Sequence, residues 1–137
     1  MEWEVLDQAV PTISDHLISE VRAFNQAALG YSDAQPLTVI ARDANGQIVA
    51  GVSGRTVYRH WLIDVLWVAE DRRSSGLGRQ LMERAEQQAR KRGCVAAQVD
   101  TLSFQAPQFY HKLGFVEIGR VADFPPGHTR YYLCKRY

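Results

Sequence analysis

The spacing of apolar residues predicts a long amphipathic helix in the middle of the chain. Leu77, Leu81 and Ala85 recur every fourth residue, with glutamates and arginines on the intervening positions. A period near 3.6 residues places such apolar side chains on one face of a helix. Gly93 can adopt the left-handed conformation that commonly follows a helix, so we expect this helix over residues 77–92.

The N-terminal part of the chain carries a second stripe of the same kind. Leu17, Val21 and Phe24 are spaced as on one helix face, and Gly30 can end that helix. Before it, segment 2–6, EWEVL, favours a short first strand.

Extended segments follow this helix. Residues 37–43 and 47–54 flank Asn45-Gly46, a favoured two-residue hairpin turn, so two antiparallel strands are expected there. Residues 61–68, WLIDVLWV, form a near-continuous apolar run, as expected of a central strand that is buried on both faces.

The order of the remaining segments predicts a mixed α/β fold. After the helix at 77–92 come a strand at 95–102, a short helix around 106–114, and a final antiparallel pair at 115–124 and 130–137. The strands on either side of the long helix are joined by a crossover connection. Such a crossover should be right-handed and place its two strands in parallel.

Composition limits the kind of protein that this chain can be. Its 137 residues, 46% of them hydrophobic, suit a single domain over residues 1–137. Sixteen basic and fifteen acidic residues give a net charge of +1, which offers no electrostatic case for binding nucleic acid or an anionic membrane. Cys94 and Cys134 lie far apart without a metal-ligand pattern, and no signal peptide or long apolar run precedes them. We therefore expect a reduced, cytoplasmic setting and no metal.

Two glycines mark the entry to the long helix. The stretch from Glu70 to Gly78 runs directly into the helix N-terminus, where unpaired backbone N–H groups and the helix dipole favour an anion. A Walker loop would need Gly-x-x-x-x-Gly-Lys-Ser/Thr, which the chain lacks, and a dinucleotide fingerprint would need a small residue where Leu81 stands. Two interpretations remain: another anion-binding loop, or an ordinary strand-to-helix turn whose glycines only permit a tight bend.

Two short motifs carry a resemblance to a known family. The segment Arg73–Gly78, RSSGLG, matches the Arg/Gln-x-x-Gly-x-Gly/Ala signature of the GNAT acyltransferase superfamily. Residues 109–115, FYHKLGF, look like the Tyr-x-x-x-Gly-Phe helix end of that family. From the predicted hairpin to its C-terminus, the chain resembles a GNAT N-acetyltransferase. It departs from the family before Pro36, where one helix stands in place of the usual two, and at Ser103, where many members carry asparagine.

The resemblance implies a fold and a binding site. The GNAT fold is a single twisted mixed sheet of six to seven strands with helices on both faces. Acetyl-CoA lies in a cleft where two parallel central strands splay, and the signature loop wraps the pyrophosphate of coenzyme A. The cofactor-binding residues that the resemblance implies are Leu66, Trp67, Val68, Arg73, Ser74, Ser75, Gly76, Leu77, Gly78, Arg79, Ser103 and Tyr110.

Acetyl transfer to an amine makes further demands on the site. An alkylamine with a pKa of about 10.4 is protonated at neutral pH, so it must lose a proton before it attacks the thioester. By resemblance, the backbone N–H of Val68 or of a neighbouring residue holds the oxyanion, and Tyr110 supports the leaving thiolate. The alternative for Tyr110 is a packing role on one helix face.

Two residues are candidates for the base. Asp64 lies four residues before Val68 and is therefore expected on the same strand face, toward the acceptor, or else hydrogen-bonded within the sheet. His128 lies in the last hairpin, where it could contact the acceptor or act as base, or else be a solvated loop residue. A water chain is the third route for the proton.

These features favour an enzyme that moves an acetyl group from acetyl-CoA to a primary amine of a small molecule or peptide, by direct attack in a ternary complex. The alternative is a non-catalytic acyl-CoA-binding sensor or interaction module, which has no evident need for Asp64 and Tyr110. Exposed edge strands would also allow a homodimer. The aromatic residues that could line an acceptor pocket are Trp61, Trp67, Phe104, Phe124, Tyr131 and Tyr132.

Overall fold

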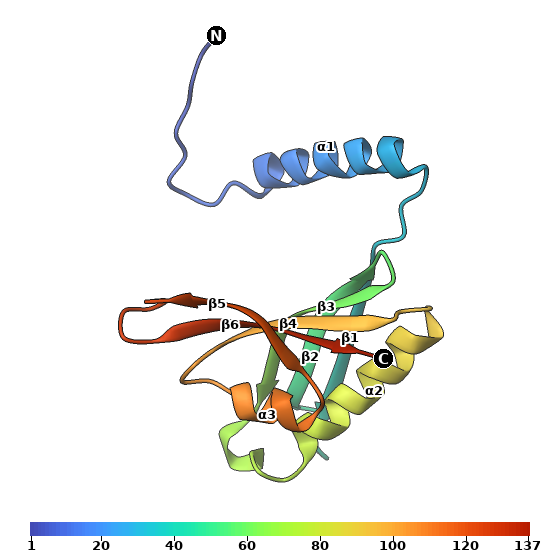
Figure 1. Ribbon diagram of the computed structural model, residues 1–137, viewed down its shortest axis with the longest axis vertical. Coiled ribbons are helices and arrows are strands. Elements are labelled where there is room, and N and C mark those ends of the chain that lie inside the picture. Colours follow the sequence, from blue (N-terminus) through green and yellow to red (C-terminus); the bar gives the residue numbers. More distant parts are fainter. The chain divides into compact units, whose positions relative to one another are not determined.

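The computed structural model describes residues 1–137 and divides into two compact units, Met1–Asp33 and Ala34–Tyr137 (Figure 1). The first unit holds one helix, α1 (Pro11–Leu29), and Gly30 ends it as predicted, with a φ of 82° and its N–H donated to the Gln26 carbonyl. The strand predicted at 2–6 is wrong, because residues 1–10 form no strand. A strand needs a partner for its backbone N–H and C=O groups, and this unit offers only a helix. None of the helices of the chain is long and apolar enough to cross a membrane.

The second unit is a mixed sheet with two helices, which confirms the predicted fold class. Its six strands lie in the order β1-β2-β3-β4-β6-β5, and only the β3–β4 pair is parallel. The elements are β1 (Gln35–Arg42), β2 (Ile48–Val57), β3 (His60–Val68), a short 3-10 helix η1 (Glu70–Arg72), α2 (Leu77–Lys91), β4 (Ala96–Leu102), α3 (Pro107–Lys112), β5 (Val116–Ala122) and β6 (Thr129–Arg136).

The loop between β1 and β2 is longer than the predicted two-residue turn. Gly46 has a φ of 80°, but Asn45 does not share the positive φ that a type I′ Asn-Gly turn requires at both positions. The loop closes instead where the Asp43 N–H donates to the Gln47 carbonyl at 3.0 Å. The Asp43 carboxylate also accepts the N–H groups of Asn45 and Gln47, which stabilises this wider loop.

The parallel strands β3 and β4 are paired only over their first halves. His60, Trp61 and Leu62 pair with residues 96–98, and the ladder stops there. Beyond Leu62 the two strands separate, which is the splay expected from the resemblance. The crossover between them is α2, as the sequence predicts.

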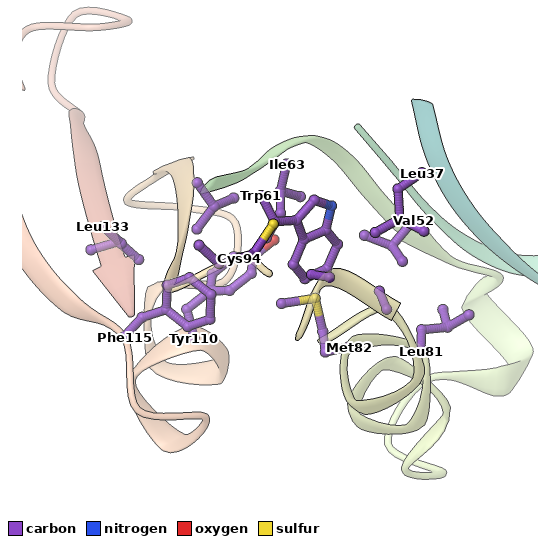
Figure 2. Close-up of a cluster of buried hydrophobic side chains, with 14 of the residues drawn as sticks. Leu37, Val52, Trp61, Ile63, Leu81, Met82, Cys94, Tyr110, Phe115 and Leu133 are labelled. Atoms are coloured by element: carbon purple, nitrogen blue, oxygen red, sulfur yellow. The ribbon is translucent and has the colours of Figure 1, made fainter. Parts of the chain in front are cut away.

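The core lies between the sheet and α2 (Figure 2). Trp61 is only 1% exposed and lies near Met82 of α2 and Val52 of β2. Trp61 therefore belongs to the core, and its suggested place in an acceptor pocket is wrong. Leu81 and Ala85 of the predicted apolar face of α2 are buried, together with Met82 and Ala89, whereas Leu77 is partly buried.

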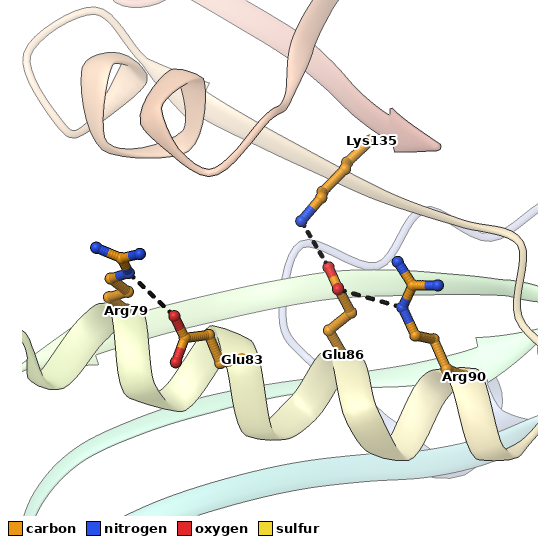
Figure 3. A network of polar contacts seen from close by, with 5 residues as sticks. All are labelled: Arg79, Glu83, Glu86, Arg90 and Lys135. Carbon is orange, nitrogen blue, oxygen red and sulfur yellow. Dashed lines mark hydrogen bonds and ion pairs between the residues drawn. The ribbon is translucent and has the colours of Figure 1, made fainter. Parts of the chain in front are cut away.

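A polar network ties the outer face of α2 to the sheet (Figure 3). The Nζ of Lys135, on β6, donates to Glu86 at 2.7 Å, and Arg90 donates to the same carboxylate at 3.2 Å. One turn earlier, Arg79 and Glu83 form a more exposed pair at 3.0 Å. Glu86 and Arg90, four residues apart on α2, thus form an ion pair with a third member from a distant strand.

Candidate functional site

The loop between β3 and α2 bends through residues with positive φ. Ser74 has a φ of 64° and Gly76 a φ of 85°, in the region that glycine adopts without strain. Gly76 is the N-cap of α2, and no side chain caps the first turn of this helix. The N–H groups of that turn are therefore available to an anion, which the helix dipole also favours. A Cβ at Gly76 would meet no atom within 4 Å, so backbone conformation and not packing demands glycine here.

A cavity of about 530 Å³ opens in front of this helix start. Three arginines on its wall, Arg72, Arg73 and Arg79, supply positive charge close to the uncapped N–H groups. A Cβ at Gly78 would lie 3.3 Å from the ring of Phe109, so the small residue allows α2 and α3 to approach each other here. Cations and free N–H donors at one helix start suit a diphosphate. The full lining is Leu66, Val68, Arg72, Arg73, Ser74, Gly76, Leu77, Gly78, Arg79, Ala106 and Phe109.

A second cavity, of about 510 Å³, lies where β3 and β4 separate. It shares Leu66, Val68, Arg73 and Ala106 with the first cavity, so the two adjoin. Its lining is Asp64, Val65, Leu66, Trp67, Val68, Arg73, Val99, Asp100, Thr101, Phe104, Gln105, Ala106 and Tyr110. A long ligand could thus extend from the start of α2 into the gap between the strands.

The backbone of Val68 points into this gap. The N–H of the next residue, Ala69, donates to the Val49 carbonyl beside β2 at 2.8 Å. Successive N–H groups along a strand point to alternate edges, so the N–H and C=O of Val68 point toward β4. The Val68 carbonyl accepts the Nε of Arg73 at 3.1 Å. The Val68 N–H is therefore a hydrogen-bond donor that points into the gap between β3 and β4.

Tyr110 lies between the core and the second cavity. Its side chain is 5% exposed and packs edge-on against Phe109 and Phe115, with ring centroids 5.2 and 5.6 Å away. Burial and, to a lesser extent, the nearby charge of Asp100 raise the pKa of Tyr110 to about 12. The two interpretations of this residue are therefore compatible: the ring packs in the core, and Tyr110 still lines the cavity.

Asp64 sits at a bulge in β3. Ile63 pairs with Gly54 and Val65 pairs with Ser53, so Asp64 is the extra residue between two ladder positions. The bulge breaks the alternation from which a face shared with Val68 was predicted, and that argument is wrong. Asp64 nevertheless lines the second cavity together with Tyr110, and its carboxylate has no hydrogen bond or ion pair in the structure.

A second carboxylate in the same cavity was missed by sequence reasoning. Asp100, on β4, accepts the Nε of Arg130 from the neighbouring strand at 3.0 Å. The neighbouring places of β3 and β4 in the sheet bring Asp100 and Asp64 to the same cavity, and nothing in the local sequence of Asp100 signals this. Asp100 is thus already paired with Arg130, whereas the Asp64 carboxylate has no partner in the structure.

Ser103 and His128 meet each other outside both cavities. The Ser103 hydroxyl accepts the N–H of Thr129 at 3.0 Å and lies 3.3 Å from Nδ1 of His128. The His128 ring also packs edge-on against Phe104, whose own side chain lines the second cavity. Ser103 therefore anchors the last hairpin and does not cap α3, which has no side-chain cap.

Most of the residues expected at the site come together in the two adjoining cavities. Ser75, Ser103 and His128 do not line them, and the Ser75 hydroxyl donates instead to the Arg72 carbonyl. Phe109 was missed, although its place beside Tyr110 in the late motif was a usable signal. Lining residues that the sequence did not point to are Val65, Arg72, Val99, Asp100, Thr101 and Gln105.

Known proteins resemble this chain over most of its length. The model of the acetyltransferase (GNAT) family matches residues 3–115. Blasticidin-S acetyltransferase of Streptomyces morookaense is 36% identical over 128 residues, which cover 90% of this chain and 93% of that protein. A solved chain from Agrobacterium tumefaciens is 30% identical, with a TM-score of 0.94 over 100% of both chains. A chain from Bacillus anthracis str. Ames, solved in complex with acetyl coenzyme A, has the same fold, with a TM-score of 0.66 at 21% identity over 74% of this chain and 62% of that one.

Proposed function

Because this chain belongs to the acetyltransferase (GNAT) family and is an acetyltransferase, we propose that it moves an acetyl group from acetyl-CoA to a primary amine by direct attack in a ternary complex. The observation that carries the proposal is the pair of adjoining cavities, which join an anion-binding helix start to a gap lined by Tyr110 and Asp64. We also propose that residues 1–137 act as one functional domain.

Coenzyme A would bind along both cavities. The uncapped first turn of α2 and the arginines at positions 72, 73 and 79 would hold its pyrophosphate. The pantetheine arm would then lie in the gap between β3 and β4, where strand edges are unpaired. Leu66 and Val68, which line both cavities, would contact the arm on its way to the reacting thioester.

Three groups of the chain would serve the chemistry. Asp64 would take a proton from the ammonium form of the acceptor, directly or through water, so that the free amine can attack the acetyl carbonyl. The Val68 N–H would donate to the oxyanion while the new C–N bond forms. As the C–S bond breaks, the thiolate would leave with a hydrogen bond from the Tyr110 hydroxyl.

The acceptor would be a small amine with a ring or other flat group. Trp67 and Phe104 offer aromatic surface beside the Asp64 carboxylate, a combination that suits a cationic amine attached to a flat body. The similarity to blasticidin-S acetyltransferase over 90% of the chain supports an amine-bearing antibiotic of that kind as the first acceptor to test.

A thiol-release assay tests the proposal. Purified protein is mixed with acetyl-CoA and, in parallel, with blasticidin S, simple alkylamines and lysine-containing peptides, and free coenzyme A is measured with a thiol reagent. We expect release that depends on an amine and a product heavier by one acetyl group. If acetyl-CoA binds but no amine in the panel increases thiol release above the rate in buffer, the proposed acceptor class is wrong.

A further inference from the structure

The turn between β4 and α3 places a side-chain amide in the wall of the second cavity. Gln105 lines this cavity, and it stands directly before Ala106, which lines both cavities. It is the only residue with an amide side chain in the lining of either one. Gln105 therefore lies near the junction where a ligand would pass from the start of α2 into the gap between β3 and β4.

The turn holds both the backbone and the side chain of Gln105. The Gln105 N–H donates to the Leu102 carbonyl at 2.8 Å. In return, the Leu102 N–H donates to Oε1 of Gln105 at 2.8 Å, and the Thr101 hydroxyl donates to the same oxygen at 3.5 Å. Thr101 is only 3% exposed, and its hydroxyl also accepts the N–H of Ala106 at 3.3 Å. The side-chain amide is thus fixed by the turn that carries it.

These contacts also decide which way the amide faces. A backbone N–H can only donate, so the atom of Gln105 that meets the Leu102 N–H must be the carbonyl oxygen. Both hydrogen bonds of the Gln105 side chain go to this oxygen, and the two N–H groups of Nε2 have no partner within residues 34–137. A fixed donor without a partner in a cavity wall is suited to hold an acceptor atom of a ligand.

The hydroxyl of Ser103, on the same turn, is not available for this role. It accepts the N–H of Thr129 at 3.0 Å, and Ser103 lines neither cavity. Many members of the family carry asparagine at this position, whereas this chain has its amide two residues later. Gln105 is therefore the amide side chain that the chain presents to the gap from the β4 side.

We propose that Gln105 is a binding residue for coenzyme A, and that its Nε2 donates to an amide carbonyl of the pantetheine arm. This inference rests on the proposed acetyl transfer from acetyl-CoA. The arm would lie between the unpaired edge of β3 and the turn that carries Gln105. A carbonyl of the arm needs a donor when it leaves water, and the Val68 N–H is already given to the oxyanion in the proposed reaction.

Gln105→Glu removes the donor and leaves the turn intact. A carboxylate has the same shape as the amide and keeps an oxygen for Leu102 and Thr101, but its second oxygen cannot donate. We expect affinity for coenzyme A, measured by calorimetry, to fall by about fivefold or more, as for the loss of one hydrogen bond. The midpoint of thermal unfolding should stay at the wild-type value. Unchanged affinity for coenzyme A would overturn the proposal.

A truncated ligand shows whether the loss concerns the arm. The probe is 3′-phosphoadenosine 5′-diphosphate, which is coenzyme A without its pantetheine arm. Its affinity for Gln105→Glu should stay within about twofold of its affinity for the wild type. An equal loss for the two ligands would mean that the new charge repels the phosphates, and it would overturn the proposal.

Two further variants separate the donor from the charge. Gln108→Glu makes the same change in the first turn of α3, at a residue that lines neither cavity, and should keep both affinities. Gln105→Met removes the donor without adding charge and should weaken coenzyme A binding as Gln105→Glu does. A Gln105→Met protein with wild-type affinity would refute the hydrogen bond, and so would an equal loss in Gln108→Glu.

Kinetics place the contact on the arm or at the reacting atoms. A carbonyl of the arm is unchanged during acetyl transfer, so Gln105→Glu should raise KM for acetyl-CoA about fivefold or more and leave kcat nearly unchanged. A loss of kcat with an unchanged KM would overturn the assignment to the arm. If acetyl-CoA binds but no amine is acetylated, the acceptor proposal fails and calorimetry still decides the role of Gln105. If coenzyme A does not bind to the wild type, both proposals are wrong.

Discussion

The Tyr110 hydroxyl is a weak acid, and it stays protonated and able to donate a hydrogen bond over a wide pH range. Burial raises its pKa to about 12, whereas a thiol has a pKa near 8.5, so full proton transfer to a departing thiolate is uphill by about 5 kcal/mol. The same shift keeps the hydroxyl protonated through neutral and moderately alkaline pH. In the proposed reaction its contribution would therefore be a hydrogen bond to sulfur.

The Tyr110→Phe variant measures that hydrogen bond while keeping the ring in the core. A charge-assisted bond of about 1.5–3 kcal/mol corresponds to a roughly 10- to 150-fold loss of kcat. KM for acetyl-CoA should stay within a few-fold, and Tyr131→Phe, outside both cavities, should keep the wild-type rate. Single-turnover kinetics check this, and a Tyr110→Phe enzyme with unchanged chemistry would leave Tyr110 as a packing residue only.

Asp64 is the carboxylate whose removal should cost most activity. Asp64→Asn is expected to lower kcat/KM by about 100-fold or more, because the acceptor must then lose its proton without help. Raising the pH should restore part of the rate as free amine accumulates. His128→Gln serves as the comparison and should change kcat/KM less than threefold, since His128 does not line the cavity. A loss confined to His128→Gln would assign the base to the last hairpin.

At the residue scale, the sequence predicted which residues line the cavities better than it predicted where their side chains point. Tyr110 and the signature loop could be found because their spacing along the chain is fixed by local structure. The direction of Asp64 could not, since a single inserted residue in β3 changes which side chains share a face. Asp100 and its partner Arg130 are brought together only by pairing between distant strands.

The loop between β3 and α2 and the first turn of α2 form one candidate binding element. A substitution at Gly76 tests whether this element binds acetyl-CoA. Gly76→Val should lower affinity for acetyl-CoA at least tenfold, because a branched side chain is strained at a φ of 85° and would project into the open cavity. Gly46→Val is the matched control, with a φ of 80° and equally open surroundings in the β1–β2 loop. Calorimetry on the two folded variants should show the loss only for Gly76→Val. An equal loss in both would mean that backbone strain alone explains it.

The attachment of α2 to the sheet gives a second test at this scale. The Glu86 carboxylate is about one quarter exposed and accepts from both Lys135 and Arg90, whereas Glu83 is more than half exposed and meets Arg79 alone. Charge-assisted bonds in half-buried positions contribute about 1–2 kcal/mol, and exposed pairs contribute about 0.5 kcal/mol or less. In urea unfolding, Glu86→Gln should therefore lower the free energy of unfolding clearly more than Glu83→Gln. Equal effects would show that the contact with β6 adds nothing.

Helices and strands were predictable where their pattern is local. The apolar face of α2, the glycine that ends α1 and the succession of the six strands along the chain all follow from periodicity and turn residues. The β1–β2 loop was mispredicted because the Asp43 side chain bonds to the backbone ahead of it and stabilises a wider turn than Asn45-Gly46 alone would form. The segment at 2–6 was mispredicted because a strand pattern without a partner strand does not make a sheet.

At the scale of the whole molecule, two short motifs were enough to predict the family and the splayed sheet, because together they specify a strand, a loop and two helices in order. The apolar surface of α1 carries no such information. Its periodicity predicts a helix with one apolar face, but nothing in a single sequence says which surface that face contacts.

The three-residue ladder between β3 and β4 has a consequence for motion within the protein. Beyond Leu62 the edge amides of β3 have no partner strand, so they should exchange their hydrogens with solvent far faster than those of the paired half. A pantetheine arm lying in the gap would act as a missing strand and slow exchange at Leu66 and Val68, while Trp61 and Leu62 would be unaffected. Hydrogen–deuterium exchange with and without acetyl-CoA follows this directly. Protection that appears only at the start of α2 would mean that acetyl-CoA is bound through its phosphates alone and does not occupy the gap between β3 and β4.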